Sequence, residues 1–315
     1  MYSAKEKLEI VSVRGGAAHF ARQPHPSRAP RGEGMQFELS LKYTACKFDI
    51  INYMHKNRKE LFLFYLFIPI ASLIVYLLKA ELYLTILIYF ILPSIYLSFK
   101  LKVNKLKIFL FSLYVGIPFG VFIDFFMTKT NGWEVVRTFV PNYKIFGYVT
   151  IVNIIWMTAY VYFVLVFYEY FFEKHKKEKM FNNWTKYLIA FTTLLLTLVP
   201  FIYYYIDYLF LGYFYLIIGL FISIIPSIFF AIKLHSHILI KKALFTGLFF
   251  MFLSFAYEIV ALKLNIWRFI DPRQFIGHIN IFSVSFPVEE LLFWIILSSF
   301  CGILMYDVFD EDIKG

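Results

Sequence analysis

The stretch FPVEELLFWIILSSFCGILMY, Phe286 to Tyr306, places two adjacent carboxylates near the start of an otherwise apolar run. A hydrocarbon core of about 30 Å is crossed by roughly 20 residues in a helix, so this run predicts a membrane span. An ionisable side chain inside a span costs several kcal/mol, about 2.5–3.5 on insertion scales, and is by default a functional candidate. Glu289 and Glu290 are therefore candidates for a functional site.

The rest of the chain is of the same kind. It has 315 residues, of which 60% are hydrophobic and 17% charged, whereas soluble domains carry about a quarter charged residues. We predict an all-α integral membrane protein with about eight transmembrane helices. The predicted spans are Leu61–Leu78, Leu82–Phe99, Leu106–Met127, Ile145–Tyr168, Tyr187–Ile206, Tyr213–Ile232, Ala243–Leu262 and Pro287–Tyr306.

Positive charge alternates between the loops, and cytoplasmic loops collect Lys and Arg. The segment before the first span and the loops after the second, fourth and sixth spans are rich in Lys, whereas the alternate loops are poorer. Both termini are predicted to be cytoplasmic, and the protein is predicted to lie in the inner (plasma) membrane of the cell. The net charge of +10 follows from this bias and from the basic N-terminal segment, so the lipid bilayer is the expected partner and nucleic acid is not.

The chain shows signs of an internal repeat. Asp124 precedes Trp133 by nine residues. About four spans later, Glu258 precedes Trp267 by the same nine residues, so the order acid then tryptophan occurs twice. Trp156 and Trp294 each precede a tyrosine by twelve residues. We predict a first membrane repeat over residues 61–180 and a second over 181–315, related by an axis along the membrane normal. Residues 35–60 form a cytoplasmic segment, and residues 1–34 are interpreted as a disordered tail or non-native extension.

Four acids, Asp124, Glu258, Glu289 and Glu290, are predicted near the non-cytoplasmic ends of their helices. Structural explanations stay open for each of them. The acids after Pro287 suit a first helical turn, where free N–H groups and the helix dipole favour negative charge. Glu258 could reach water or pair with Lys263. The tryptophans are often membrane-interface residues.

The pattern from Glu258 to Trp267, the pair Ile276 and Gly277, and the run from Phe286 to Phe293 resemble the lycopene cyclase domain of the small membrane type. In that family a P-x-E-E or P-x-E-D motif opens a membrane helix. The resemblance is specific over about Tyr257–Tyr306 and weaker over Val121–Glu169. Aligning Trp156 with Trp294 places Ile151 and Val152 opposite the two glutamates, so the first repeat is expected to hold a degenerate site.

The resemblance implies a carotenoid cyclase, an intramolecular lyase or isomerase that needs no cofactor or metal and causes no net redox change. An acid would protonate the end of a linear, apolar polyene and start ring closure. Glu289 or Glu290 would be the proton donor, with Glu258 as its partner. Trp267, Trp133 and Phe293 would stabilise the cation through their ring faces. Pro287 and Asp124 complete the expected substrate-binding set.

Other interpretations remain. The chain could be a non-catalytic subunit or carotenoid-binding membrane partner of the same fold, and the need for a second subunit or a homodimer is open. A glutamate-dependent intramembrane protease of the E-E-x-x-x-R type is a further alternative. Against it, Trp294 stands at the arginine position and His278 falls in a loop. The two cysteines, Cys46 and Cys301, lie too far apart along the chain to suggest a disulfide or metal site.

Overall fold

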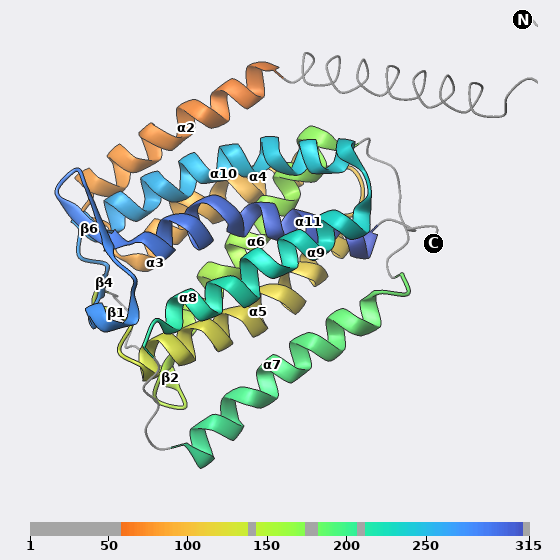
Figure 1. Cartoon of the computed structure of the whole chain (residues 1–315). Coiled ribbons are helices and arrows are strands. Elements are labelled where there is room, and N and C mark those ends of the chain that lie inside the picture. The colour runs from red at the N-terminus through yellow and green to blue at the C-terminus, as the bar shows by residue number, and fades with distance from the viewer. Residues whose placement is uncertain (1–57, 138–142, 174–181, 207–211, 311–315) are drawn as a thin grey trace, which may run out of the picture. The chain divides into compact units, whose positions relative to one another are not determined.

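The computed structural model describes residues 58–137, 143–173, 182–206 and 212–310 (Figure 1). The predicted segment 1–34 and most of 35–60 lie outside these residues. Eight helices are long and apolar enough to cross a membrane, in agreement with the eight predicted runs. They span Arg58–Leu77, Leu82–Lys100, Lys105–Lys129, Ile151–Phe172, Thr185–Tyr205, Phe214–Leu234, His237–Lys263 and Glu290–Phe309.

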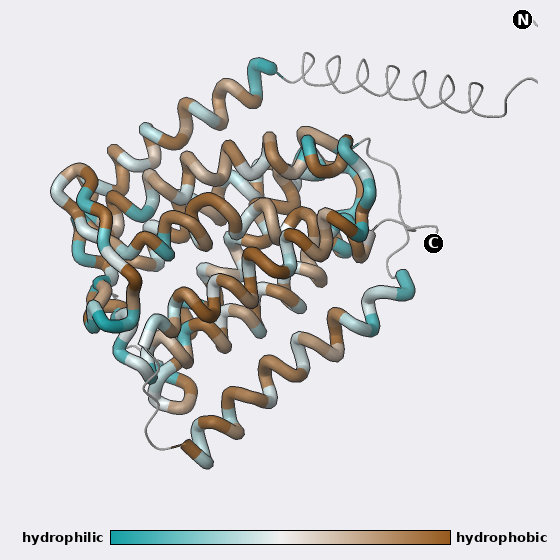
Figure 2. Tube along the Cα trace, viewed as in Figure 1, coloured by the Kyte–Doolittle hydropathy of each residue, from teal (hydrophilic) through white to brown (hydrophobic). Residues whose placement is uncertain are grey.

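Five of these spans are single or nearly single helices, labelled α2 (Arg58–Leu77), α5 (Lys105–Lys129), α6 (Ile151–Phe172), α7 (Thr185–Tyr205) and α10 (His237–Lys263). The eighth begins as a wide π-helical segment, η4 (Glu290–Leu297), and continues as α11 (Ser298–Asp310). Figure 2 shows that brown, hydrophobic positions run along all of these helices, as the bilayer requires.

The second and sixth spans share an irregularity. The second consists of α3 (Leu82–Ile86), the π-helical η1 (Leu87–Ile91) and α4 (Leu92–Lys100); the sixth consists of α8 (Phe214–Gly219), η2 (Leu220–Ile224) and α9 (Ile225–Leu234). Each wide turn leads directly into a proline, Pro93 or Pro226, at the start of the next segment. Proline has no N–H and crowds the carbonyl four residues before it, so a wider turn relieves the helix at this point.

Three short two-stranded sheets gather at one end of the helices, at the left of Figure 1. They pair β1 (Trp133–Val135) with β4 (Trp267–Phe269), β2 (Lys144–Ile145) with β3 (Val149–Thr150), and β5 (His278–Ile281) with β6 (Val284–Pro287), all antiparallel. In the first of these sheets Glu134 lies opposite Arg268. We call this end of the molecule the strand end.

One predicted helix start was wrong at the strand end. The fourth span begins at Ile151 and not at Ile145, because the preceding residues form the β2–β3 hairpin. The hairpin turns through Phe146 and Gly147, both with positive φ. An apolar strand next to an apolar helix leaves no composition change to mark this boundary. The eighth span begins directly after Pro287, which ends strand β6, within one residue of the predicted start.

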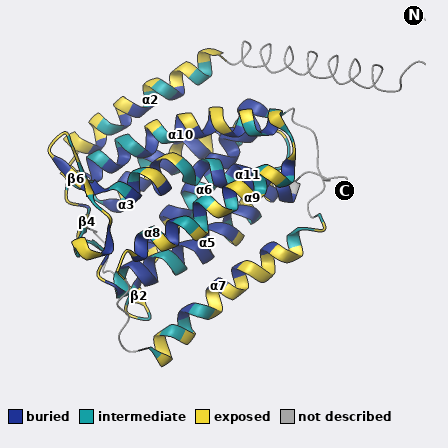
Figure 3. Cartoon of the chain, viewed as in Figure 1, coloured by how far each residue is buried: buried dark blue, intermediate teal, exposed yellow. Residues whose placement is uncertain are grey.

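Helices α6, α10 and α11 form the buried centre, dark blue in Figure 3, whereas α2 and α7 are mostly exposed. Aromatic rings fill much of this centre, and the rings of Phe167 and Phe249 stack at 4.3 Å. Helices α5 and α6 approach closely at Gly116, where an added Cβ would lie 2.5 Å from Thr158 Cα. Gly116 and Gly120 form a G-x-x-x-G pair, which permits such close packing of membrane helices.

The end opposite the strands carries a reciprocal pair of buried hydrogen bonds. Tyr168 in α6 donates to Asp307 in α11 at 2.9 Å, and Tyr306 in α11 donates to Glu169 in α6 at 2.7 Å. The two helices therefore exchange equivalent tyrosine–carboxylate bonds. They also meet midway, where the Tyr160 and Ser298 hydroxyls lie 2.8 Å apart.

Candidate functional site

All four predicted acids lie at the strand end and are buried. Asp124 and Glu258 lie near the ends of α5 and α10, while Glu289 and Glu290 stand where the eighth span begins. Their exposed fractions are between 0% and 4%. Among the described residues, none of the four forms an ion pair with Lys, Arg or His. Buried charges without such pairing are costly, so each acid needs hydrogen-bond donors or a neutral form.

Asp124 is bonded to several groups of the protein. Its carboxylate accepts from the Trp133 indole N–H at 3.0 Å, from the Thr150 backbone N–H at 2.6 Å and hydroxyl at 2.8 Å, and from the Asn153 amide at 2.6 Å. Thr150 directly precedes α6, so Asp124 holds the start of that helix. Its arrangement is that of a structural capping group.

Glu258 has a different environment. It is fully buried and accepts one hydrogen bond, from the Trp267 indole N–H at 3.0 Å. Its second oxygen, Oε2, has no hydrogen-bond partner among the described residues. The expected alternatives of a side chain reaching water or pairing with Lys263 are therefore wrong. Asp124 and Glu258 each precede a tryptophan by nine residues, and each accepts a hydrogen bond from that indole N–H. Of the two acids, only Glu258 has a carboxylate oxygen without a donor among the described residues.

The two adjacent glutamates point to different partners. Glu289 accepts from the backbone N–H of Ile276 at 2.6 Å and thereby ties the loop before β5 to the start of the eighth span. Glu290 accepts from the Tyr215 hydroxyl, which comes from α8. This divergence follows from the roughly 100° between neighbouring residues on a helix. Only Glu290 lines the pocket described next.

A small pocket of about 30 Å³ lies at the strand end. A space of this size holds roughly one or two water molecules, so a larger ligand would have to displace side chains of the pocket wall. Its walls come from β1, β4, α6 and η4, so both predicted repeats contribute. The lining residues are Trp133, Val135, Asn153, Trp156, Trp267, Phe269 and Glu290. We call it the tryptophan pocket.

Aromatic rings continue behind the tryptophan pocket. The ring centroid of Trp156 lies 4.5 Å from that of Trp294 and 6.2 Å from that of Trp267. Tyr257 packs at 5.1 Å from Trp267. Strands β1 and β4 present their Trp, Val and Phe side chains to the pocket, while Glu134 and Arg268 between them form an exposed ion pair at 2.8 Å. The site thus combines one carboxyl group with an aromatic enclosure.

The structure brings some of the predicted residues together and separates others. Trp133, Trp267 and Glu290 line the tryptophan pocket, and Asp124 and Glu258 lie directly behind the two tryptophans. Two other predicted residues contact different partners. Phe293 packs against Gly219 of α8, and Pro287 pairs with His278 in the β5–β6 sheet.

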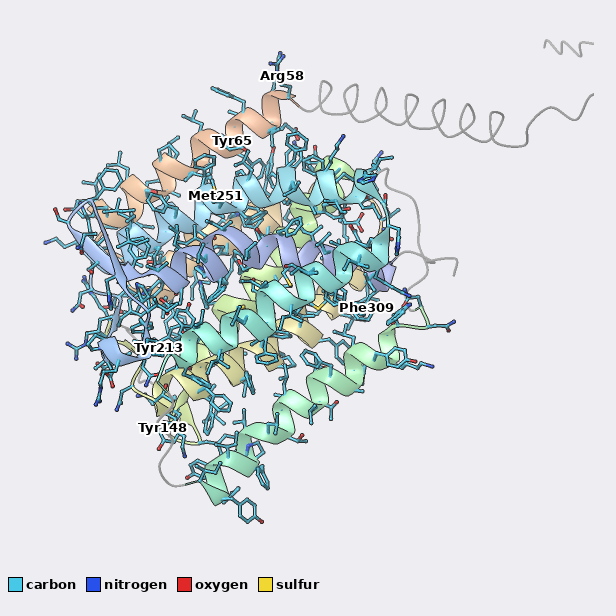
Figure 4. All side chains as sticks on the ribbon, viewed as in Figure 1. Arg58, Tyr65, Tyr148, Tyr213, Met251 and Phe309 are labelled. Carbon is cyan, nitrogen blue, oxygen red and sulfur yellow. The ribbon has the colours of Figure 1, made fainter. Side chains whose placement is uncertain are left out.

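Sequence reasoning missed several residues of the site. Tyr215 is one of 24 tyrosines and stands 75 positions before Glu290, so nothing in the sequence singles it out. It lies in the first turn of α8, two residues after Tyr213, which Figure 4 labels at the strand end. Trp156 drew attention only through the repeat spacing. Asn153, Val135 and Phe269 carried no signal of their own.

Histidine does not join the glutamates. His278 is exposed, and its ring packs edge-on against Phe275 at 5.6 Å. No group of three or more His, Cys, Asp or Glu among the described residues is arranged to hold a metal ion. The glutamate–histidine arrangement of the protease alternative is therefore absent from this part of the chain.

Comparison of the chain with protein-family models, curated proteins and solved structures gave no match. Conclusions about function therefore depend on the residues and geometry described above.

Proposed function

We propose that the protein is an integral membrane cyclase of the lycopene cyclase type, which closes a ring at the end of a linear, apolar polyene. The observation that carries the proposal is Glu290, a buried carboxyl group without a cationic partner in the described chain, at the wall of the tryptophan pocket. In an apolar surrounding without a cation, the neutral acid is favoured over the carboxylate. A neutral carboxyl group is the form that can donate a proton.

The proposed reaction balances without redox chemistry. Glu290 transfers its proton to the terminal double bond and leaves a tertiary carbocation. The electrons of an internal double bond attack that carbon, form the ring bond and move the positive charge into the ring. Loss of a ring proton to the Glu290 carboxylate then forms the new double bond and restores the acid. Glu258 orients Trp267 and does not itself line the pocket.

The surroundings of Glu290 suit a cationic intermediate. The rings of Trp133, Trp156 and Trp267 line the same pocket, and their π faces attract positive charge. The aromatic walls also limit the access of water, which would otherwise trap the cation as an alcohol. Side chains of the pocket wall would have to move to admit one end of a long polyene, whose remainder would lie along the apolar exterior of the helices.

We also infer that the two halves arose by duplication. Residues at equivalent positions meet one another: Glu134 with Arg268 in the paired strands, Trp156 with Trp294, and Tyr160 with Ser298. These contacts support an approximate two-fold axis along the helices. The π-helical turns before Pro93 and Pro226 supply independent support.

In this scheme the first half keeps the fold without a catalytic acid. Asp124 is occupied in holding α6, and Ile151 and Val152 stand where the second half has its glutamates. One catalytic carboxyl group then serves a pocket that both halves enclose. The Lys-rich loops favour a cytoplasmic location for the opposite end, so the strand end would be non-cytoplasmic, in an inner (plasma) membrane.

The test is the pigment profile of lycopene-accumulating cells that express residues 35–315. The wild type, Glu290→Gln, Glu289→Gln and the exposed-site control Glu134→Gln are compared by chromatography with absorbance and mass detection. We expect cyclic products of unchanged mass from the wild type and the control, and none from Glu290→Gln. If only Glu289→Gln is inactive, the proton donor is its neighbour and our assignment is wrong.

A different result supports the non-catalytic alternative. Lycopene that stays linear, with the wild-type protein present in the membrane, would contradict cyclase activity. Recovery of lycopene with the purified protein in that case would identify a carotenoid-binding partner.

A further inference from the structure

Two of the residues that line the tryptophan pocket carry side-chain oxygen atoms. Glu290 comes from the start of η4, and Asn153 comes from the first turn of α6. Both are buried, with exposed fractions of 4% and 8%. The two predicted repeats therefore each place one polar side chain at the same small space.

Glu290 has one oxygen that the described residues leave without a hydrogen bond. Its Oε2 accepts from the Tyr215 hydroxyl, whereas Oε1 has no donor among the described residues. Because Oε2 is already engaged and the residue lines the pocket, Oε1 is the atom that a group in the pocket can reach. A neutral Glu290 would for the same reason carry its proton on Oε1.

The amide of Asn153 is divided between Asp124 and the pocket. Its Nδ2 donates to the Asp124 carboxylate at 2.6 Å. The reverse amide orientation would set an oxygen against a carboxylate, which only accepts, so chemistry fixes which end is the nitrogen. The oxygen Oδ1 has no donor among the described residues and is what Asn153 offers to the pocket.

The pocket wall has no free donor for these two oxygens in the described chain. The indole N–H groups of Trp133 and Trp267 are committed to the acids behind them. The Trp156 N–H is enclosed by other atoms. A buried acceptor left without a donor costs about 1–3 kcal/mol, so a small group that brings its own donors is favoured in this space.

Water has the required size and chemistry. The pocket of about 30 Å³ has room for one or two water molecules, and a buried water needs two or more polar partners. A water molecule carries two O–H donors, one for each acceptor. Larger donors would have to displace the aromatic wall.

We propose that the tryptophan pocket binds one water molecule that bridges Glu290 Oε1 and Asn153 Oδ1. When Glu290 is ionised, the water donates to both oxygens. When Glu290 is neutral, its O–H donates to the water, and the water donates to Asn153. Asn153 is thus a positioning residue, which orients the Glu290 carboxyl group through the water.

The water site follows from the pocket geometry and does not require cyclase activity. If the proposed cyclisation also holds, the entering end of the polyene takes the place of this water. The molecule best placed to trap the cation would then leave as the substrate arrives.

The direct test is a crystal structure of the purified full chain at a resolution that shows ordered water. We expect a density peak about 2.5–3.0 Å from both Glu290 Oε1 and Asn153 Oδ1 before any water is included in refinement. A direct hydrogen bond between the two side chains, or no peak between them, would overturn the proposal.

Hydroxyl-radical footprinting tests the same water in variants. Radicals formed from water by X-rays modify adjacent side chains, and mass spectrometry counts the modified peptides. Trp156 lines the pocket, while Trp294 does not, although their rings lie 4.5 Å apart and both are buried. We expect several-fold faster modification of Trp156 than of Trp294 in the wild type.

Two variants separate the water from the structural role of Asp124. Asn153→Leu has a similar size without the oxygen and should lower the modification of Trp156 to the rate of Trp294. Thr150→Val removes a different donor to Asp124, outside the pocket lining, and should leave Trp156 unchanged. Unchanged modification in Asn153→Leu, or an equal decrease in both variants, would contradict the bridging water.

Discussion

The indole N–H of Trp267 donates a 3.0 Å hydrogen bond to Glu258, nine residues before it in the chain. Trp133 makes the same bond, at the same distance, to Asp124. In both motifs the helix ends a few residues after the acid, and the chain turns through a residue with positive φ, Asn131 or Asn265. The strand that follows brings the tryptophan back beside the acid. The two motifs are alike in geometry and differ in how many other donors each acid receives.

That difference predicts unequal effects of removing the indole N–H. Trp133→Phe leaves Asp124 with Thr150 and Asn153 as donors, so a small destabilisation, about 1 kcal/mol, is expected. Trp267→Phe leaves Glu258 with no donor among the described residues, so a loss of about 2 kcal/mol is expected. The measurement is the temperature at which each variant unfolds in detergent, with gel filtration as the readout, and it shows which variant is less stable. A larger loss for Trp133→Phe would show that the extra bonds to Asp124 contribute little.

Tyr215→Phe should reduce product formation without reducing the amount of protein. The phenol holds Glu290 in one position, and misplacing a catalytic group by about 1 Å costs up to about a hundredfold in rate. Tyr213→Phe is the matched control, because Tyr213 is exposed and lies two residues earlier. Product yield per membrane-inserted protein is the measurement. Equal yields from the two variants would remove Tyr215 from the site.

Gly219 and Gly302 should respond in opposite ways to alanine. A Cβ at Gly219 would overlap the Phe293 ring, so Gly219→Ala forces α8 and η4 apart and should cost about 1–3 kcal/mol. Gly302 has nothing within 4 Å of the new Cβ. Alanine is favoured over glycine inside a helix by roughly 0.5–1 kcal/mol, so Gly302→Ala should be neutral or stabilising. The measurement is the midpoint of thermal unfolding of each variant. A Gly219→Ala variant as stable as the wild type would contradict the close packing of Gly219 against Phe293.

The β1–β4 pairing can be trapped by a disulfide. Residues directly opposite on antiparallel strands have Cα atoms about 4.5–5.5 Å apart, within reach of a disulfide. Glu134→Cys with Arg268→Cys, in a chain whose Cys46 and Cys301 are replaced by serine, should cross-link on mild oxidation. Glu134→Cys with Arg273→Cys should not, because Arg273 lies beyond β4. Peptide mass mapping identifies the products, and cross-linking of the control pair alone would place the strands in another register.

Cysteine labelling tests which side of the membrane the strand end faces. Glu134→Cys should react with a membrane-impermeant maleimide in intact cells, because Glu134 is exposed at the strand end. Lys102→Cys, in the loop between α4 and α5, should react only after the cells are opened. The reverse pattern would invert the proposed orientation and move the tryptophan pocket to the cytoplasmic side.

Several features of this fold could be predicted from the sequence because they are local. Each span is a contiguous apolar run whose length the bilayer prescribes, so the eight segments are recognisable one by one. The boundary at Ile151 was not predictable. The preceding residues are apolar whether they form strand or helix, and the choice depends on their pairing in the β2–β3 hairpin.

The site shows the same limit. Burial of Glu289 and Glu290 was expected from their position. Their different hydrogen-bond partners, Ile276 for Glu289 and Tyr215 for Glu290, were not expected, because they depend on the rotation of η4 relative to α8 and to the loop at Ile276. Phe293 was expected in the site for its place beside the motif, yet its ring points to Gly219.

By itself, then, the sequence determined the class of the protein, the number of apolar spans and the meeting of four acids at one end, because hydropathy and chain direction suffice for these. Only the tertiary structure decided that Asp124 is saturated with donors, that Glu258 is not, and that Glu290 faces a pocket with Tyr215 beside it. Hydrogen-bond partners 75 residues apart are set by how packed helices rotate against one another, and no local pattern encodes that rotation.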